Sequence, residues 1–397
     1  MAKIILKKGR EESLKRFHPW VFSGAIAQIV GEPAEGDVVE VYGQDGKFLA
    51  AGHYQIGSIA VRVLSFESGV INADYWKSML SRALAVRIAT GLADSETTNC
   101  YRLVHGEGDN LPGLIIDWYD GVCVMQAHSA GMFRAKKQIA QALVEIYGDK
   151  LKAVYDKSSG TAPFKAGLDL VDGYLYKKEG FNDNEQIVVE NGHKFIVNWT
   201  EGQKTGFFLD QRENRALVER YAKGRNVLNL FCYTGGFSIY ALGAGATHVD
   251  SVDSSAKAMA LVDKNVEIGG FDKSRHTSLC VDALDYLRDV PEDKYDLMIV
   301  DPPAFAKHRG ALNNALRAYL RLNAAAISKV APGGFVFTFS CSQVVTKEAF
   351  ALAVFSAAAQ TGRKVRILDR LNQPSDHAVN IYHPEGEYLK GLLLYVE

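Results

Sequence analysis

The apolar positions at the start of the chain recur in the short, alternating runs that are typical of β-strands. Val38–Tyr42 forms one such run, an Asp45-Gly46 turn follows it, and a second apolar run completes the pattern of a hairpin. Residues 58–65 predict a further strand. We therefore expect a β-rich domain over residues 1–70.

The period of the apolar positions changes after residue 70. Trp76, Leu80, Leu84 and Ile88 recur at every fourth position, which predicts an amphipathic helix. Residues 101–121 predict two strands joined by a turn rich in Gly, Asp and Pro, and a second helix is expected near residues 131–148. These elements indicate a small α+β domain over residues 71–185.

From residue 186 onward, short apolar runs alternate with helix-length segments. The runs are "NVLNLFC", "THVDSVD", "HTSLCVD", "YDLMIVDPP" and "GGFVFTFSC". Such alternation predicts an α/β domain, with a parallel sheet covered by helices on both faces. The last two strands, near residues 365–368 and 391–396, are separated by Gly, Pro and His, so we expect them to pair antiparallel at the sheet edge.

Composition places the chain among cytoplasmic globular proteins. Its 397 residues are 47% hydrophobic and 23% charged, and the first residues, "MAKIILKKGR", lack the apolar core of a secretory signal. No apolar run approaches the roughly 18 residues that span a membrane. Five cysteines without paired spacing argue for a reducing compartment and against disulfides or a zinc site.

The formal net charge of −1 is unevenly distributed along the chain. Six Lys and Arg residues against two Glu give the first twenty positions a charge of +4. Such a cluster beside aromatic residues indicates either a polyanion site or a solvated surface. The RNA-binding candidates here are Lys7, Lys8, Arg10, Arg16, His18 and Trp20.

Ligands of doubly wound folds bind at the carboxyl ends of the parallel strands. Gly235 and Gly236 follow the first strand and permit close approach of a ligand, but the pattern is not G-x-G-x-x-G. Asp253 ends the second strand, where a carboxylate holds ribose hydroxyls, and Asp282 ends the third, where it can accept from an adenine amino group. Each aspartate has an alternative role as a helix N-cap. Together they indicate an adenosine-bearing cofactor without a pyrophosphate, S-adenosylmethionine.

The fourth strand ends in Asp301-Pro302-Pro303, a rigid turn that frees backbone carbonyls to accept from an exocyclic amine. Phe305 is placed to stack on a base. Lys307 and Arg309 are placed to meet phosphate. The alternative is a turn with no function beyond ending a strand.

The fifth strand, "GGFVFTFSCSQ", ends with Cys341 between two serines. A thiolate that adds to C6 of a pyrimidine makes C5 nucleophilic toward a methyl sulfonium, and this chemistry requires an accessible cysteine with a lowered pKa. Cys341 would share a crevice with Asp301, because their strands are neighbours. The other four cysteines, Cys100, Cys123, Cys232 and Cys280, are interpreted as structural.

Several motifs together resemble one enzyme family: "EGQKTGFFLDQRENR", "NLFCYTGGFS", "VDPPAFAK", "FTFSCSQ" and "HPEGEYLKGLLL". Over essentially the whole chain, the sequence is similar to the RlmI-type bacterial 23S ribosomal RNA (cytosine-C5)-methyltransferases. The resemblance implies a Rossmann-like class I S-adenosylmethionine methyltransferase domain at residues 186–397, an N-terminal PUA RNA-binding domain and a small middle domain. It also implies methylation of a cytosine in 23S ribosomal RNA. Because flipping the target base costs least when the base is already single-stranded, we expect naked RNA or an assembling subunit as the substrate. The protein is expected to be a monomer or homodimer.

Carried over by position, Cys341 becomes the nucleophile, Asp301 lies at the catalytic site, and residues 204–212, including Arg212, cover the cofactor and the target base. Pro302, Pro303 and Phe305 contact that base. The cofactor-binding candidates are Asn229, Phe231, Tyr233, Gly235, Gly236, Asp253, Ser254, Asp282 and Asp301.

The sequence departs from related enzymes at Ala304, where many RNA cytosine-C5 methyltransferases carry a second cysteine. The group that removes the C5 proton is therefore open, with Asp301 or a water as candidates. The Asp-Pro-Pro-Ala-Phe motif also resembles enzymes that methylate nitrogens, so N-methylation of a purine is an alternative.

Functions other than methyl transfer find less support in the sequence. A non-enzymatic RNA-binding protein would not need the intact Gly-Gly, Asp253 and Asp-Pro-Pro set. A dehydrogenase is disfavoured by the missing G-x-G-x-x-G. The stretch "HGEGD" at residues 105–109 is interpreted as a turn, and no metal site is expected.

Overall fold

The computed structural model describes residues 1–163 and 166–397 and divides the chain into two compact units. Unit 1 comprises Met1–Gln186, Val197–Phe207 and Ser375–Gly386, and unit 2 comprises Ile187–Ile196, Phe208–Pro374 and Glu387–Glu397. The segment Ser375–Gly386, here called the C-terminal excursion, therefore belongs to unit 1 although the residues on both sides of it belong to unit 2.

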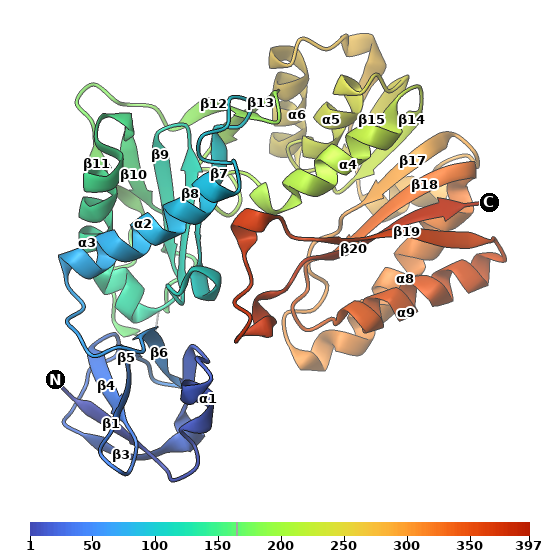
Figure 1. The fold of residues 1–397 in the computed structure, drawn as a ribbon. Helices are drawn as coiled ribbons and strands as arrows, with labels where there is room; N and C mark the ends of the chain where they lie inside the picture. Colours follow the sequence, from blue (N-terminus) through green and yellow to red (C-terminus); the bar gives the residue numbers. More distant parts are fainter. Residues whose placement is uncertain (164–165) are drawn as a thin grey trace. The chain divides into compact units, whose positions relative to one another are not determined.

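Unit 1 begins with a six-stranded sheet in the order β2-β6-β5-β4-β1-β3 (Figure 1). Its strands are β1 (Lys3–Leu6), β2 (Trp20–Phe22), β3 (Ile26–Val30), β4 (Val38–Tyr42), β5 (Phe48–Tyr54) and β6 (Ile59–Ser65), and the short helix α1 spans Glu12–Lys15. The predicted hairpin is confirmed, since β4 pairs antiparallel with β5. Ile4, Val39 and Val61 are fully buried in the core of this sheet.

A second sheet of unit 1 has the order β11-β10-β9-β8-β7. Its strands are β7 (Cys100–His105), β8 (Leu114–Tyr119), β9 (Val122–Ala127), β10 (Ala153–Asp156) and β11 (Gly173–Lys177), and its helices are α2 (Ala73–Ala89) and α3 (Ala130–Tyr147). The strand pair expected within residues 101–121 is confirmed as β7 and β8. Trp76 and Leu80 of α2 are buried as predicted, whereas Ile88 is 47% exposed, so the apolar stripe stops short of the helix end. A separate two-stranded sheet joins β12 (Glu185–Glu190) to β13 (His193–Asn198).

Unit 2 contains a seven-stranded sheet in the order β16-β15-β14-β17-β18-β20-β19. Its strands are β14 (Asn226–Leu230), β15 (His248–Asp253), β16 (His276–Cys280), β17 (Tyr295–Val300), β18 (Val330–Ser340), β19 (Val365–Asn372) and β20 (Lys390–Val396). Strands β14 to β18 are parallel, and β20 is antiparallel to both of its neighbours. This confirms the predicted parallel sheet and the antiparallel pair at its edge.

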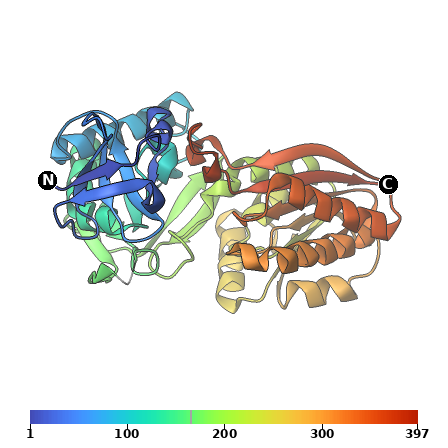
Figure 2. The same cartoon turned by 90° about the horizontal axis from the view of Figure 1, so that it is seen from below.

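Helices flank the seven-stranded sheet of unit 2 (Figure 1). They are α4 (Arg212–Ala222), α5 (Gly236–Gly243), α6 (Ala256–Ile268), α7 (Ala283–Asp289), α8 (Leu312–Lys329) and α9 (Lys347–Thr361). Helices α8 and α9 lie side by side, and Figure 2 shows them on one side of the strands. Tyr319 of α8 and Phe350 of α9 are buried with β17 and β18 in one core. Among the residues described, no helix is both long and apolar enough to cross a membrane.

Candidate active site

The turn after β14 concentrates unusual backbone conformations in five residues. Phe231 has φ +56°, Tyr233 has φ +47° and Gly235 has φ +77°. Bulky residues with positive φ are uncommon and strained, and they persist where a site requires them. A Cβ on Gly235 would lie 3.0 Å from Cγ1 of Val262, so only glycine fits this turn without a shift.

Asn229, on β14, is fully buried below this turn. Its Nδ2 donates to Oγ of Ser238 at 2.8 Å, and that hydroxyl lies 2.7 Å from Oγ of Ser251 on β15. The side chain therefore ties β14 to α5 and the neighbouring strand. Its position supports the turn from beneath.

The aspartates at the ends of the next two strands accept hydrogen bonds from nearby backbone amides, but only Asp282 caps a helix, because the N-cap of α6 is Ser255. Asp253 accepts from the backbone N–H groups of Tyr233 at 3.0 Å and Ser255 at 2.9 Å. Asp282 is the N-cap of α7 and accepts from the amides of Leu284 and Asp285 through one oxygen, Oδ1. A carboxylate has about four acceptor sites, so each of these groups keeps acceptor capacity for a ligand.

Asp301 follows β17 and is half-buried. Its Oδ2 accepts from Nε2 of Gln211 at 2.9 Å, and Oε1 of Gln211 accepts from Nδ2 of Asn214 at 2.6 Å. Pro302 is buried and Pro303 is exposed. The carboxylate is thus held in place by a side-chain relay from the start of α4.

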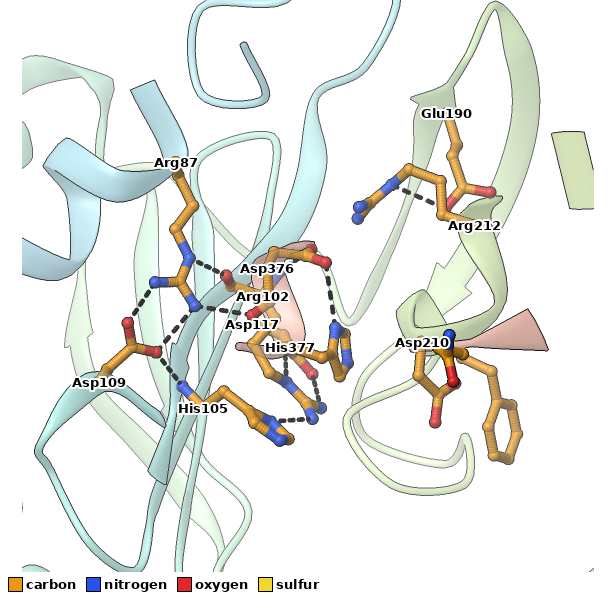
Figure 3. A network of polar contacts seen from close by, with 12 residues as sticks. Arg87, Arg102, His105, Asp109, Asp117, Glu190, Asp210, Arg212, Asp376 and His377 are labelled. Atoms are coloured by element: carbon orange, nitrogen blue, oxygen red, sulfur yellow. Dashed lines mark hydrogen bonds and ion pairs between the residues drawn. The ribbon is translucent and has the colours of Figure 1, made fainter. Parts of the chain in front are cut away.

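The segment that opens α4 is fixed by a buried ion-pair network within unit 2. Glu190 accepts two bonds of 2.8 Å from Arg215, and Nε of Arg212 lies 3.5 Å from the same carboxylate (Figure 3). Tyr240 contributes a further bond of 3.0 Å. The RNA contact expected for Arg212 is therefore corrected: its side chain is fully buried, because it balances a buried glutamate.

Cys341 stands directly after β18, and the two serines beside it fasten the strand end. Oγ of Ser340 donates to the hydroxyl of Tyr319 at 2.8 Å, and Oγ of Ser342 donates to the carbonyl of Ala306 in the loop after Asp301. β17 and β18 run parallel, with Val300 opposite Thr338, so the ends of both strands lie at the same edge. Phe305 packs on Tyr319 with ring centroids 4.8 Å apart.

Lys390 is a site residue that the sequence reasoning missed. It pairs with Ser340 across β18 and β20, and only 5% of it is exposed. Its Nζ donates to the carbonyls of Ser342 at 2.6 Å and Val345 at 2.7 Å, so it holds the turn that directly follows Cys341. Burial lowers the pKa of Lys390 to about 8, against the opposing influence of the neighbouring Cys341 thiolate. The feature of the sequence that could have indicated this residue is a lysine at the start of an otherwise apolar strand.

The remaining cysteines differ in exposure. Cys100, Cys123 and Cys232 are buried, and burial raises the pKa values of Cys123 and Cys232 well above the usual range of a thiol. This agrees with a structural role. Cys280 differs from the buried cysteines, although it was interpreted as structural with them: it is exposed, because it is the last residue of edge strand β16.

The expected RNA-binding side chains fall in both units. Lys7, Lys8, Arg10 and Arg16 are exposed in unit 1, where Nζ of Lys7 donates to the carbonyl of Gly24 at 2.9 Å. His18 and Trp20 are half-buried, and Nε1 of Trp20 donates to Oε1 of Glu107 at 2.8 Å. Lys307 and Arg309 are exposed in unit 2.

Residues 105–109 were predicted to form a turn, and the structure has a short helical turn there. Asp109 pairs with the buried Arg87, whose Nη2 also donates to the carbonyl of Asp376 at 2.7 Å (Figure 3). No cluster of three or more potential metal ligands occurs among the described residues. The polar residues here hold unit 1 together.

The fold and the strand-end site define a class of enzyme. The model of an S-adenosylmethionine-dependent methyltransferase family matches residues 101–392, and that of a PUA-like domain matches residues 4–66. A solved structure from Streptococcus mutans, described as a SAM-dependent methyltransferase, has a TM-score of 0.84 and 25% identity with full coverage of both chains. A methyltransferase complexed with SAH gives a TM-score of 0.85 at 25% identity and the same coverage. The cofactor expectation is thereby confirmed.

Curated relatives narrow the family further. Ribosomal RNA large subunit methyltransferase I of Aeromonas hydrophila is 41% identical over 99% of both chains. The protein of the same name from Alteromonas mediterranea is 40% identical over 99% of this chain and 98% of its own. The chain belongs to the family of these methyltransferases.

Proposed function

We propose that this protein transfers the methyl group of S-adenosylmethionine to C5 of a cytosine in large-subunit (23S) ribosomal RNA. The names of the full-length relatives support the RNA class. The choice of C5 rests on Cys341, whose thiol is half-exposed at the end of a strand. The neighbouring Ser342 fastens that strand end to the loop after Asp301. Nitrogen methylation has no use for such a thiol.

The residues around the β14 turn suit the proposed cofactor. Phe231, Tyr233, Gly235 and Gly236 would shape its cradle, since a Cβ at Gly235 or Gly236 would approach neighbouring side chains within 3.1 Å. The remaining acceptor sites of Asp253 and Asp282 suit ribose hydroxyls and an adenine amino group, with Asn229, Ser254 and Asp301 around them. The bound cofactor would supply an electrophilic methyl group.

Cys341 would act as the nucleophile. Its thiolate sulfur adds to C6 of cytosine, and the electron pair of the C5–C6 double bond becomes available at C5. After C5 has gained the methyl group, a base removes the C5 proton, the double bond re-forms and the sulfur–C6 bond breaks. Asp301, held by Gln211, is the proposed acceptor of that proton. Ala304 stands where related enzymes have a second cysteine.

Lys390 would stabilise the thiolate. Its ammonium group is anchored on the carbonyls of Ser342 and Val345, in the turn that begins directly after Cys341. A buried cation beside a thiol favours the ionised, nucleophilic form. This supplies a local source of positive charge that does not depend on RNA.

The substrate base would be unstacked and inserted beside these groups. Phe305 would stack on it, while the carbonyls around Pro302 and Pro303 would accept from its amino group. Unstacking costs a few kcal/mol and least for single-stranded bases, so naked or partly assembled RNA is the expected substrate. Lys307 and Arg309 would contact its phosphates.

Nucleoside mass spectrometry tests this proposal. Unmodified large-subunit ribosomal RNA is incubated with the protein and S-adenosylmethionine, and the products are compared for the wild type, Cys341→Ala and Cys280→Ala. We expect 5-methylcytidine with the wild type and with Cys280→Ala, whose cysteine is exposed at another strand end, but none with Cys341→Ala. A methylated purine that persists in Cys341→Ala would establish N-methylation instead.

A further inference from the structure

The C-terminal excursion is anchored in unit 1 by buried and close contacts. The backbone amide of Arg102 donates to Oδ2 of Asp376 at 2.9 Å, and Arg87 donates to the carbonyl of the same aspartate (Figure 3). Nδ2 of Asn380 donates to the carbonyl of Glu107 at 3.2 Å. A Cβ on Gly108 would lie 1.9 Å from the carbonyl oxygen of Ala378, so glycine is needed where the two backbones meet.

This anchoring places aromatic side chains of the excursion against the N-terminal sheet. Tyr382 lies beside Phe17, with ring centroids 5.3 Å apart, and His383 packs on Trp20 at 4.2 Å. Both contacts are internal to unit 1. The rings of His18 and Phe22 continue the cluster, at a separation of 5.9 Å.

The outer members of this cluster remain accessible. Phe17 is 48% exposed, Phe22 is 47%, Tyr382 is 49% and Ile381 is 85%. Grouped apolar side chains of this kind mark interaction sites on soluble proteins. Phe17 has φ +61°, a strained conformation for an aromatic residue. The native state therefore holds this exposed ring in place at a cost in backbone free energy, which is typical of residues that bind a ligand.

The charges around these rings favour a polyanion. Arg10 and Arg16 are exposed on the same short stretch as Phe17, while Lys15 is paired with Glu11 and Glu12. Glu107, which accepts from Nε1 of Trp20, forms an ion pair with Arg62 at 2.9 Å. Glu385 lies near His383, at 3.8 Å, and is the exposed acidic residue of the excursion, since Asp376 is buried. Half-exposed aromatic rings beside arginines bind single-stranded nucleic acid by stacking and phosphate contact.

We propose that the C-terminal excursion and the N-terminal sheet together form a single-stranded RNA platform, on which bases stack against Phe17, Phe22 and Tyr382. Residues near the end of the methyltransferase chain thus complete the RNA surface of the N-terminal domain. The proposal rests on the proposed RNA substrate but not on the position that is methylated.

The test measures RNA affinity and methyl transfer separately in the full-length protein. The RNA probes are a fluorescein-labelled 20-nucleotide single strand of mixed sequence and deproteinised large-subunit ribosomal RNA. The variants are Phe17→Ala, Tyr382→Ala and the conservative Tyr382→Phe. Phe355→Ala is the matched control, because Phe355 is an exposed aromatic residue (68%) on α9 of unit 2.

We expect each alanine variant of the platform to weaken binding of the single strand by about five-fold or more, as loss of one stacked base requires. Tyr382→Phe and Phe355→Ala should bind as the wild type does. The KM for ribosomal RNA should rise while kcat and S-adenosylmethionine affinity stay unchanged. Gly108→Ala, which displaces the excursion without removing a ring, should reproduce the loss.

Unchanged RNA affinity in Phe17→Ala and Tyr382→Ala would overturn the proposal. Unchanged RNA affinity together with a new elution volume in size-exclusion chromatography would assign the surface to a protein partner instead. A wild type that forms no 5-methylcytidine, with RNA binding still lost in the platform variants, would refute the proposed reaction and leave the platform standing.

Discussion

At the scale of single residues, the candidate site residues of unit 2 could be predicted because they directly follow strands. Cys341 and Asp301 each directly follow a buried strand, and parallel neighbours bring such residues to one edge. Their approximate places could be predicted because the apolar runs were unbroken. Lys390 could not, since a lysine at the start of an apolar run normally marks a surface. Its burial depends on two carbonyls from another strand's turn.

Lys390→Met should slow alkylation of Cys341 by iodoacetamide at pH 7 by about ten-fold, because the thiolate loses the neighbouring ammonium group. Peptide mass spectrometry assigns the modified cysteine. Lys347→Met is the control, since Lys347 forms an ion pair with Glu387 at partly exposed positions. Equal alkylation rates in the wild type and Lys390→Met would remove Lys390 from the mechanism. S-adenosylmethionine binding verifies that both variants fold.

At the scale of elements, local pattern predicted the secondary structure but not its partners. The α/β alternation predicted the order of strands and helices along unit 2, and the edge pair β19 and β20 was predicted because Gly, Pro and His replace a helix between them. Arg212 illustrates the limit: its sequence neighbours are polar and suggest a surface, yet it meets Glu190 from a distant hairpin. The C-terminal excursion is a second example, since nothing in its sequence predicts that its backbone packs against Gly108.

The turn between β14 and α5 allows a matched comparison of two glycines. Gly235→Ala should destabilise the protein by about 1–2 kcal/mol through its positive φ and should also weaken S-adenosylmethionine binding, because the turn must shift away from Val262. Gly245→Ala has a similar φ, +87°, and open space around it, so it should lose stability alone. Calorimetric titration and urea unfolding separate the two effects. Equal cofactor affinity in both variants would contradict a cradle at Gly235.

At the scale of the whole molecule, the histidines buried in unit 1 make its stability depend on pH. Unit 1 encloses histidines in its core, and burial lowers the pKa of His53 to about 4. Burial and the nearby His377 lower the pKa of His105 as well. In the unfolded chain these rings titrate near their ordinary value of about 6.5.

Unit 1 should therefore lose stability as the pH falls from about 6.5 toward 4, because the unfolded chain takes up protons that the native state excludes. From about pH 7.5 upward both states are deprotonated and the effect vanishes. At pH 4 the contribution of His53 is about 3 kcal/mol. Hydrogen exchange of β5 at pH 7.5 and pH 5 measures the part of this loss that is already present at pH 5, about 2 kcal/mol. His53→Gln should flatten the dependence, and an unchanged slope would show that His53 is not the group responsible.

The central claim is that Cys341 forms a covalent bond to the target base, and an RNA carrying 5-fluorocytidine tests it most directly. Fluorine at C5 cannot leave as a cation, so the final elimination is blocked and the sulfur–C6 bond persists. With S-adenosylmethionine present, we predict a denaturation-resistant RNA–protein adduct that mass spectrometry maps to Cys341 and that Cys280→Ser retains. Methyl transfer to this RNA without any adduct, or an adduct that survives in Cys341→Ser, would contradict the account.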